Sequence, residues 1–332
     1  MAVKNPSAMV ITGILQATSI MYKNQEFVAD KLFPIINGLA PNTKVPKYHK
    51  GPWYTDEAEV RGPGAAAVLG EFSVTTSDLS TINYAIGTKV TDEEMRDANL
   101  PGSFPMNPKL DAMEWMANKL DLKREVRASA VLHATNWNAI GVGGEDTEGG
   151  WGHATAASDT FLADMKKARD LIRKNAGVMA NTLFLDYVAF SALQSAPALM
   201  AMLYPTAVSS SGPLISKQAL AQLAMVNEVI VGTAIKSSDE ETVAGTEFTA
   251  VDVWGASGKG IGFLYYKPAR AGLKIPAPGY QYRINQDNGQ FRKSTTWRDD
   301  AIHSDRYDSQ EECDIAAVGL DLGYMFKDTA AT

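Results

Sequence analysis

The spacing of hydrophobic positions changes along the chain, and the two clearest patterns predict one strand and one long helix. From Ile82 to Val90 apolar and polar residues alternate, which is typical of a half-buried strand. From Asn107 to about Ala134 the apolar residues follow a helical repeat, with Asn107 as the expected N-cap and Pro108 as the first helical residue. The face that we expect to be buried carries Leu110, Met113, Ala117 and Leu120.

The other faces of this long helix carry both signs of charge. Lys123, Arg124 and Arg127 alternate with acidic residues such as Asp121 and Glu125. Such a mixture predicts a solvated, amphipathic helix and not a basic DNA-binding one.

A short helix is predicted just before the long one. Thr91 and Glu94 have the spacing of a capping box, in which each side chain accepts a hydrogen bond from the backbone N–H of the other residue. Asn99 and Pro101 are expected to end this helix.

Helical and strand patterns alternate over residues 159–267, which predicts helices packed on a small sheet. Ser158 is the expected cap of a helix that ends at Gly177 in a left-handed turn. The core positions of that helix are Phe161, Leu162, Met165, Ala168 and Ile172. The segments TLFLD, EVIVG and GIGFLYYK are expected to be its buried strands, and residues 268–326 return to β character.

Two segments cannot bury themselves within one chain. Residues 1–43 are predicted to form an arm with a short helical piece around residues 14–21. Residues 44–90 are predicted to form a long hairpin, with the stretch 47–72 pairing with the alternating strand and RGPGAAAVLG at its tip. Together with the long helix they would leave more apolar surface exposed than a monomer keeps in water, so we expect neighbouring subunits to complete the fold.

Length, charge and cysteine content limit the classes of function that are possible for this chain. The 332 residues exceed one small domain, and 38 acidic against 31 basic residues give a net charge of −7 that repels nucleic acid phosphates. A single cysteine, Cys313, allows no disulfide within the chain. No export signal and no apolar run of about 18 residues is present, so a membrane location is not expected.

Two acidic clusters are candidates for metal binding, but each has a simpler interpretation. Asp299, Asp300, His303 and Asp305 lack the strict spacing and turn glycine of an oxygen-ligand site, so a solvated turn between two strands is favoured. The cluster in GGEDTEGG also lacks the alternating calcium-loop pattern and is interpreted as a flexible connector.

Catalytic motifs give no better candidate. The stretch WGASGKGIG, with Lys259, lacks the spacing, the Ser or Thr and the following helix of a phosphate-binding loop, so a hairpin turn is favoured. The histidines have no HExxH spacing, the cysteine has no partner, and no GxSxG motif occurs. We therefore expect no catalytic residues, no metal and no cofactor.

Several motifs resemble those of a known family. The segment EFVADKLFPIINGLAPNTKVPKYHKGPWYTDEAEVRGPGA, followed by YAIGTKVTDEEMRDANLP, is similar to the major capsid proteins of tailed bacteriophages. The order of NTLFLD, EVIVGTA, VWG and YYKPARAGL also resembles that family. The resemblance extends over residues 27–326 and implies an α+β fold of the Hong Kong-97 type.

The resemblance implies five regions in this chain. They are an N-terminal arm (1–43), an extended loop (44–90), a peripheral domain with a spine helix (91–158), an axial domain (159–267), and return strands to the peripheral domain and β-hinge (268–332). The extended loop would be a clasp between subunits, with Trp53 as its apolar anchor. Its expected inter-subunit contacts are Lys50, Asp56, Glu57, Glu59 and Arg61. No motif singles out Lys44, Lys47 or Lys50 for a covalent crosslink.

The implied function is structural. The chain would form pentamers and hexamers of an icosahedral shell around double-stranded DNA in the virion, without sequence-specific binding, after assembly in the host cytoplasm. Expected partners are a separate scaffolding protein, a portal and a decoration protein. The alternatives are an encapsulin-like cellular shell that holds cargo enzymes, and, less favoured, an α/β enzyme.

Overall fold

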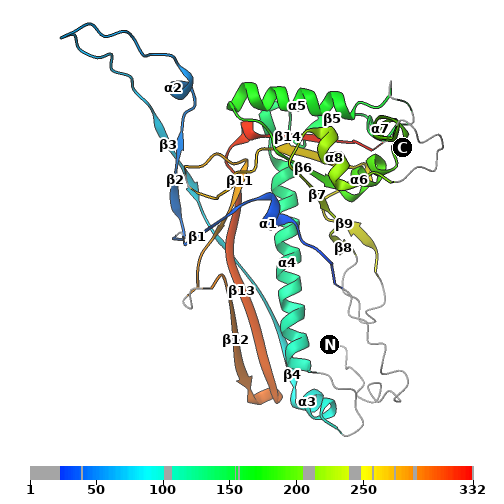
Figure 1. Ribbon diagram of the computed structural model, residues 1–332. Helices are drawn as coiled ribbons and strands as arrows, with labels where there is room; N and C mark the ends of the chain where they lie inside the picture. Colours follow the sequence, from blue (N-terminus) through cyan, green and yellow to red (C-terminus); the bar gives the residue numbers. More distant parts are fainter. Residues whose placement is uncertain are drawn as a thin grey trace.

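The elements divide into a compact region, an elongated region and a projecting loop (Figure 1). The computed structural model describes residues 23–38, 40–100, 107–153, 155, 158–204, 214–238, 248–255, 258–272, 274–286 and 290–330. The expected α+β class is confirmed, whereas the helical piece predicted around residues 14–21 lies outside the described residues. No helix in the described ranges is both long and apolar enough to cross a membrane.

The compact region is built on a five-stranded sheet with the order β5-β14-β10-β6-β7. Its strands are β5 (Glu145–Asp146), β6 (Thr182–Asp186), β7 (Glu228–Gly232), β10 (Ile261–Tyr265) and β14 (Gly323–Lys327). β6 is parallel to β7, and β10 is antiparallel to both β6 and β14. All three predicted strand segments are confirmed.

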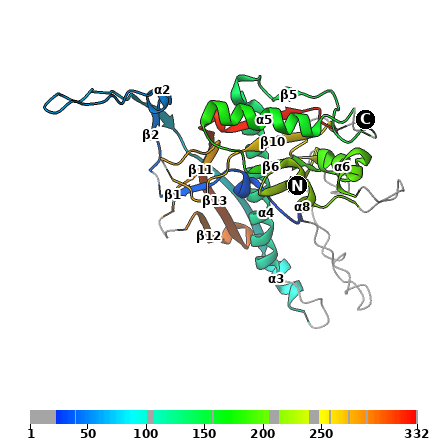
Figure 2. The ribbon, with the colours of Figure 1, turned by 45° about the horizontal axis from the view of Figure 1, so that its top comes forward.

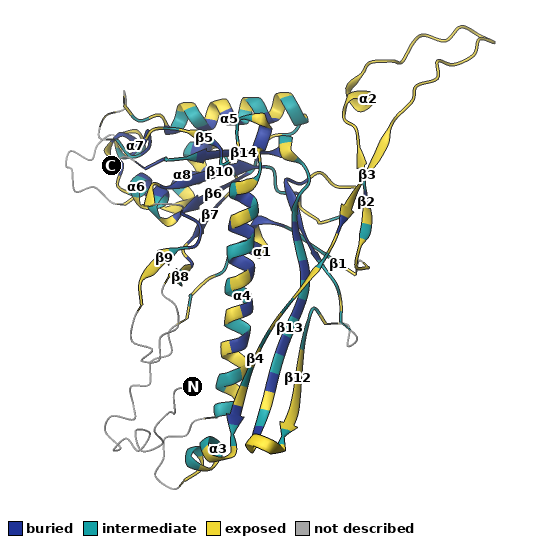
Figure 3. Ribbon diagram, turned by 180° about the vertical axis from the view of Figure 1, so that it is seen from behind, coloured by how far each residue is buried: buried dark blue, intermediate teal, exposed yellow. Residues whose placement is uncertain are grey.

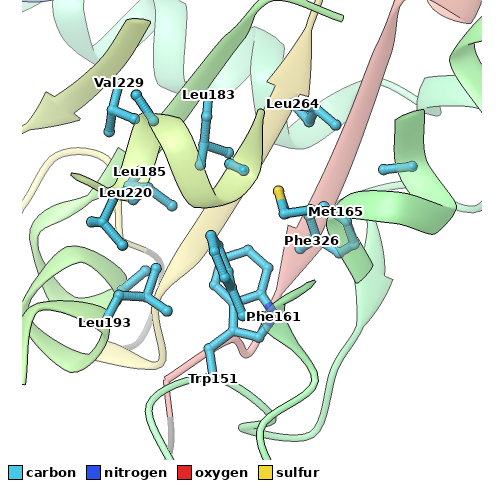
Figure 4. Packing of buried hydrophobic residues seen from close by; sticks show 14 of the residues in the cluster. Trp151, Phe161, Met165, Leu183, Leu185, Leu193, Leu220, Val229, Leu264 and Phe326 are labelled. Carbon is cyan, nitrogen blue, oxygen red and sulfur yellow. The ribbon is translucent and has the colours of Figure 1, made fainter. Parts of the chain in front are cut away.

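Two hydrophobic cores lie against this sheet, one on each face. Leu183 and Leu185 belong to the core under the helices, whereas Phe184 between them belongs to the core that includes α4. The helices of the first core are α5 (Phe161–Ala176), α6 (Tyr187–Gln194), α7 (Pro197–Leu203) and α8 (Lys217–Ala224). Figure 4 shows this core, where the ring centroids of Phe161 and Phe326 lie 5.3 and 5.2 Å from that of Trp151.

Helix α5 ends as predicted but begins later. Gly177 adopts the left-handed conformation with φ 69° and closes the helix. The predicted cap, Ser158, is wrong: the helix starts at Phe161, and the Asp159 carboxylate accepts a hydrogen bond from Phe161 N at 3.0 Å. The N-cap position is Thr160, whose side chain makes no capping bond, and Asp159 satisfies the first helical N–H from the turn before it.

The acidic GGEDTEGG cluster is not simply a connector. Glu145 and Asp146 form β5, because the end of β14 offers them parallel backbone partners. Glu145 also accepts hydrogen bonds from Lys167 and from the Tyr324 hydroxyl. The interpretation as a flexible loop is therefore wrong for these two residues.

The elongated region is a second sheet with a long helix lying along it. The sheet contains β1 (Ile35–Asn37), β4 (Ile82–Thr91), β11 (Gly279–Arg283), β12 (Arg292–Asp299) and β13 (Ser304–Ala317). The predicted alternating strand is confirmed as β4, where Val90 is buried and Ile86 half-buried. Its predicted partner is wrong, because β4 pairs with β13 along its whole length, from Thr91↔Ser304 to Ile82↔Cys313.

The long helix is α4 (Pro108–Ala134), whose 27 residues span about 40 Å. Asn107 caps it as predicted, accepting a hydrogen bond from Leu110 N at 3.3 Å, and the Thr91–Glu94 capping box opens α3 (Asp92–Ala98). The predicted buried face is only partly right, since Leu120 is buried but Leu110 and Met113 are exposed. Apart from the elements of the projecting loop, the short elements are α1 (Ala29–Leu32), β8 (Ile235–Ser237), β9 (Ala250–Asp252), and single turns at Trp137–Ala139, Asp300–Ile302 and Leu320–Leu322.

Two charged residues of α4 that were expected in solvent are buried. Arg124 pairs with Glu311 of β13 at 2.8 Å and with Asp30 of α1 at 3.4 Å. Glu125 is fully buried: its Oε1 accepts from Val28 N and Trp254 Nε1, both at 2.8 Å, and its Oε2 accepts from Ala29 N at 2.9 Å. The start of α1, the spine helix and the compact region therefore meet at one carboxylate.

Replacing Trp254 by Phe tests this junction. The change keeps an aromatic ring at this position but removes the indole N–H that donates to Glu125, together with part of the buried ring volume, so the carboxylate loses one of three donors. We expect unfolding of the purified protein in denaturant to show that the free energy of unfolding falls by about 1–3 kcal/mol. The control is Trp115→Phe on the exposed side of α4, which should change stability little; equal effects of the two changes would contradict the importance of this buried junction.

Asp30 provides a pH test. Burial raises the pKa of this carboxyl, but Arg124 and Arg283 outweigh burial and hold the pKa below its usual range. A lowered pKa in the folded state stabilises the fold above the ordinary carboxyl pKa, and the contribution is lost as pH falls through the lowered value.

Asp30→Asn should therefore be less stable than the natural protein near pH 7. The difference between the two should shrink below about pH 4 and vanish in stronger acid. Thermal unfolding over a pH series measures it, with Asp170→Asn on α5 as the control, because Asp170 has no ion pair in the described part of the chain. A difference that stays constant with pH would refute the assignment.

Candidate functional site

The extended loop, defined here as residues 49–73, projects from the body of the molecule (Figures 1 and 2). It is carried by β2 (Thr43–Tyr48) and β3 (Val74–Leu79), which pair antiparallel from Thr43↔Leu79 to Tyr48↔Val74. The last backbone hydrogen bond between its two sides joins His49 N to Ser73 O at 3.3 Å. Every residue of the loop is exposed, as Figure 3 shows.

An aromatic cluster forms the base of the loop. Trp53 lies in the one-turn helix α2 (Gly51–Tyr54), and its ring centroid is 6.2 Å from those of both Tyr48 and Phe72. These rings, with Lys274 and Pro276 from a distant segment, line a cavity of about 650 Å³. The Trp53 side chain is 64% exposed, so most of the predicted anchor is available for contact outside its own subunit.

Two side chains fasten this base to the compact region. Lys50 Nζ donates to Asp321 Oδ2 at 2.6 Å and to the carbonyl of Asn175 at 3.1 Å. The Tyr54 hydroxyl donates to the carbonyl of Ala176 at 2.7 Å. Both carbonyls belong to the last turn of α5, where a helix leaves acceptors unpaired and favours a cation. Lys50, predicted to reach a neighbour, is engaged within its own subunit here.

The outer part of the loop presents charges without ion-pair partners in the described residues. This part carries Asp56, Glu57, Glu59 and Arg61. The Glu57 carboxylate lies so close to Gly70 that a Cβ atom at position 70 would be only 2.6 Å from Glu57 Oε2. Arg61 Nε donates to Ala65 O at 2.6 Å, which closes the tip. The structure therefore brings the aromatic side chains together at the base of the loop. The predicted charged contacts lie apart from one another along the exposed outer part.

Sequence reasoning missed how the base is held. Tyr54 and Lys274 belong to no recognisable motif. Asn175 and Ala176 contribute only their backbone carbonyls, and the identity of a residue does not show that its carbonyl will be used. A usable signal was the concentration of aromatic residues near the two ends of the loop: Tyr48, Trp53, Tyr54 and Phe72.

The other candidate clusters have structural partners. The stretch 299–305 forms the turn between β12 and β13, as the simpler interpretation predicted, and Arg298 contacts Asp92, Asp300 and Asp305 around it. Lys259 donates to Asp328 Oδ2 at 2.6 Å. No group of three His, Cys, Asp or Glu side chains suited to a metal ion is found among the described residues.

The long helix α4, the β-rich elongated region, the compact region and the projecting loop together give the arrangement expected of a Hong Kong-97-type fold. Comparison with known proteins confirms the resemblance to phage major capsid proteins and their Hong Kong-97-type fold. The chain is 23% identical over 326 residues to the major capsid protein of Burkholderia phage BcepMu, covering 95% of each chain. No family model matches.

Solved structures share the fold at low identity. A crystal structure of a phage-related protein from Bordetella bronchiseptica matches with a TM-score of 0.65 and 23% identity, covering 97% of this chain and 98% of that one. The capsid structure of cyanophage P-SCSP1u matches with a TM-score of 0.60 and 9% identity, covering 95% and 91%. The mature capsid of bacteriophage PhiM1 matches with a TM-score of 0.54 and 12% identity, covering 98% of both chains.

The projecting loop generates a prediction about hydrogen exchange. Because residues 55–72 have no backbone ladder and no buried side chain, their amides should exchange fast in free subunits or capsomers. In assembled shells they should exchange at least about tenfold more slowly, since docking on a neighbour supplies the missing partners. Amides of β13 serve as the control and should be protected in both states. Equal protection of the loop in both would mean that it is no clasp.

Proposed function

We propose that this chain is the structural subunit of a tailed-phage capsid shell. The observation that carries the proposal is the extended loop, in which every residue from His49 to Ser73 is exposed while Lys50 and Tyr54 fix its base. A hairpin that is held at one end and bare at the other is suited to a contact outside its own subunit. The similarity to a phage major capsid protein supports the same role.

The finer features of this role rest on the resemblance to the family. We propose pentamers and hexamers in an icosahedral shell that encloses double-stranded DNA without reading its sequence, assembled in the host cytoplasm. The net charge of −7 supports a lining that does not grip phosphate. A scaffolding protein, a portal and a decoration protein are proposed partners, Trp53 is the proposed anchor of the clasp, and no catalytic activity is proposed.

Electron microscopy and light scattering of the purified protein, alone and with its scaffolding protein, test the proposal. We expect closed shells or capsomers. A variant in which residues 55–72 are replaced by Asn-Gly should stay folded by circular dichroism but form no shells, because residues 50–54 and the new Asn-Gly still connect β2 to β3 while the outer loop is missing.

The result that would overturn the proposal is a stable monomer under all these conditions. Shells isolated from the producing cell that hold a cargo enzyme in place of DNA would favour the encapsulin-like alternative.

A further inference from the structure

The cavity at the base of the extended loop has the size and the lining of a pocket for a small organic ligand. Tyr48, Trp53 and Phe72 line it from the loop, and Lys274 and Pro276 line it from the segment that precedes β11. Its volume of about 650 Å³ lies within the range of about 300–1,000 Å³ that is typical of such pockets. The aromatic rings supply the apolar surface with which these pockets hold a ligand.

Both walls of the cavity are held in place by hydrogen bonds within the subunit. The bond from the Tyr54 hydroxyl to the last turn of α5 fixes the helix that carries Trp53. The segment that carries Lys274 is held by the buried Tyr280, whose hydroxyl donates to the carbonyl of Ile275 at 2.7 Å. A pocket whose walls are fixed before binding loses little conformational entropy when a ligand enters.

The charge of the lining favours an anionic ligand. Lys50 and Lys274 line the cavity, and no acidic residue is among its described lining residues. Asp321 compensates the charge of Lys50 at 2.6 Å, whereas Lys274 is exposed and has no ion pair in the part of the chain that the structure describes. Aromatic walls alone would also suit a cation, but the ammonium groups of this lining would repel one.

A second hollow beside the cavity has the same sign of charge. It has a volume of about 500 Å³, shares Tyr48, Lys50 and Lys274 with the cavity, and adds Lys47. Lys47 is exposed and has no ion pair with a described residue, whereas the one carboxylate of this hollow, Asp321, is bound by Lys50. The entrance to the cavity is therefore positive although the whole chain is acidic.

We propose that this cavity is a binding site for a flat aromatic anion. The rings of the ligand pack against Trp53, Tyr48 and Phe72, and its acidic group pairs with the ammonium group of Lys274. All the groups that form the site belong to one chain, so binding is measured on the unassembled protein and its outcome is independent of the proposed function.

Fluorescence titration of the purified, unassembled protein with two dyes tests the proposal. Anilinonaphthalene sulfonate has fused aromatic rings and one anionic group, and phenylnaphthylamine has the same rings without the charge. Lys274→Glu should weaken binding of the sulfonate at least about tenfold, because repulsion replaces the ion pair, but should change binding of the uncharged dye less than about twofold. Trp53→Ala should weaken binding of both dyes at least about fivefold, since it removes a large part of the aromatic wall.

Two matched variants outside the cavity are the controls. Lys166→Glu on α5 reverses an exposed charge, and Trp297→Ala on β12 removes a partly exposed ring; both should leave the affinity for each dye within about twofold of the natural protein. Circular dichroism checks that all four variants are folded.

Three results would overturn the proposal. Equal weakening of sulfonate binding by Lys166→Glu and Lys274→Glu would show a general effect of net charge. Equal weakening of both dyes by Lys274→Glu would exclude a contact with the acidic group. Unchanged binding in Trp53→Ala would show that the dyes bind elsewhere on the surface.

Discussion

The buried carboxylate of Glu125 is the point through which the parts of the subunit are held together. It accepts backbone hydrogen bonds from the start of α1 and a side-chain bond from Trp254, while its own backbone lies in α4. Burial raises the pKa of Glu125, and the three donors only partly compensate. A group so costly to bury keeps its place only if all its partners stay in position, so the carboxylate fixes the angle between the arm, the spine helix and the compact region.

The neighbouring residue extends this junction toward the sheet. Arg124 joins Asp30 of α1 to Glu311 of β13, and Arg292 also contacts Glu311 at 2.9 Å. Both adjacent residues of α4 thus contact α1 or its start, and Arg124 also reaches β13 whereas Glu125 also reaches Trp254. Because each buried charge is paired or hydrogen-bonded, breaking one contact would leave its partner uncompensated.

Local features were predictable from the sequence, and contacts between distant segments were not. The capping box at Thr91, the cap at Asn107 and the glycine end of α5 depend on a few neighbouring residues, so their spacing sufficed. The partner of β4 is β13, more than 200 residues away. The alternation of apolar and polar residues in β4 was equally compatible with pairing to the nearer stretch 47–72, so the pattern could not identify the partner. Arg124 and Glu125 had the pattern of a solvated face, because nothing local reveals that an arm and a tryptophan will cover them.

The loop combines a fixed base with a bare outer part, and this division suits a contact that must be made only on assembly. The carbonyls at the end of α5 have no helical partners, so Lys50 and Tyr54 satisfy them and orient α2 at little conformational cost. Beyond α2 the outer part of the loop forms no backbone ladder and packs against no hydrophobic core. Ordering it in an isolated subunit would cost about 1–2 kcal/mol of conformational entropy per residue. Under the proposed function, a neighbouring subunit that packs against the outer part would offset that cost. The base therefore sets the direction in which the loop leaves the subunit, whatever the outer part contacts.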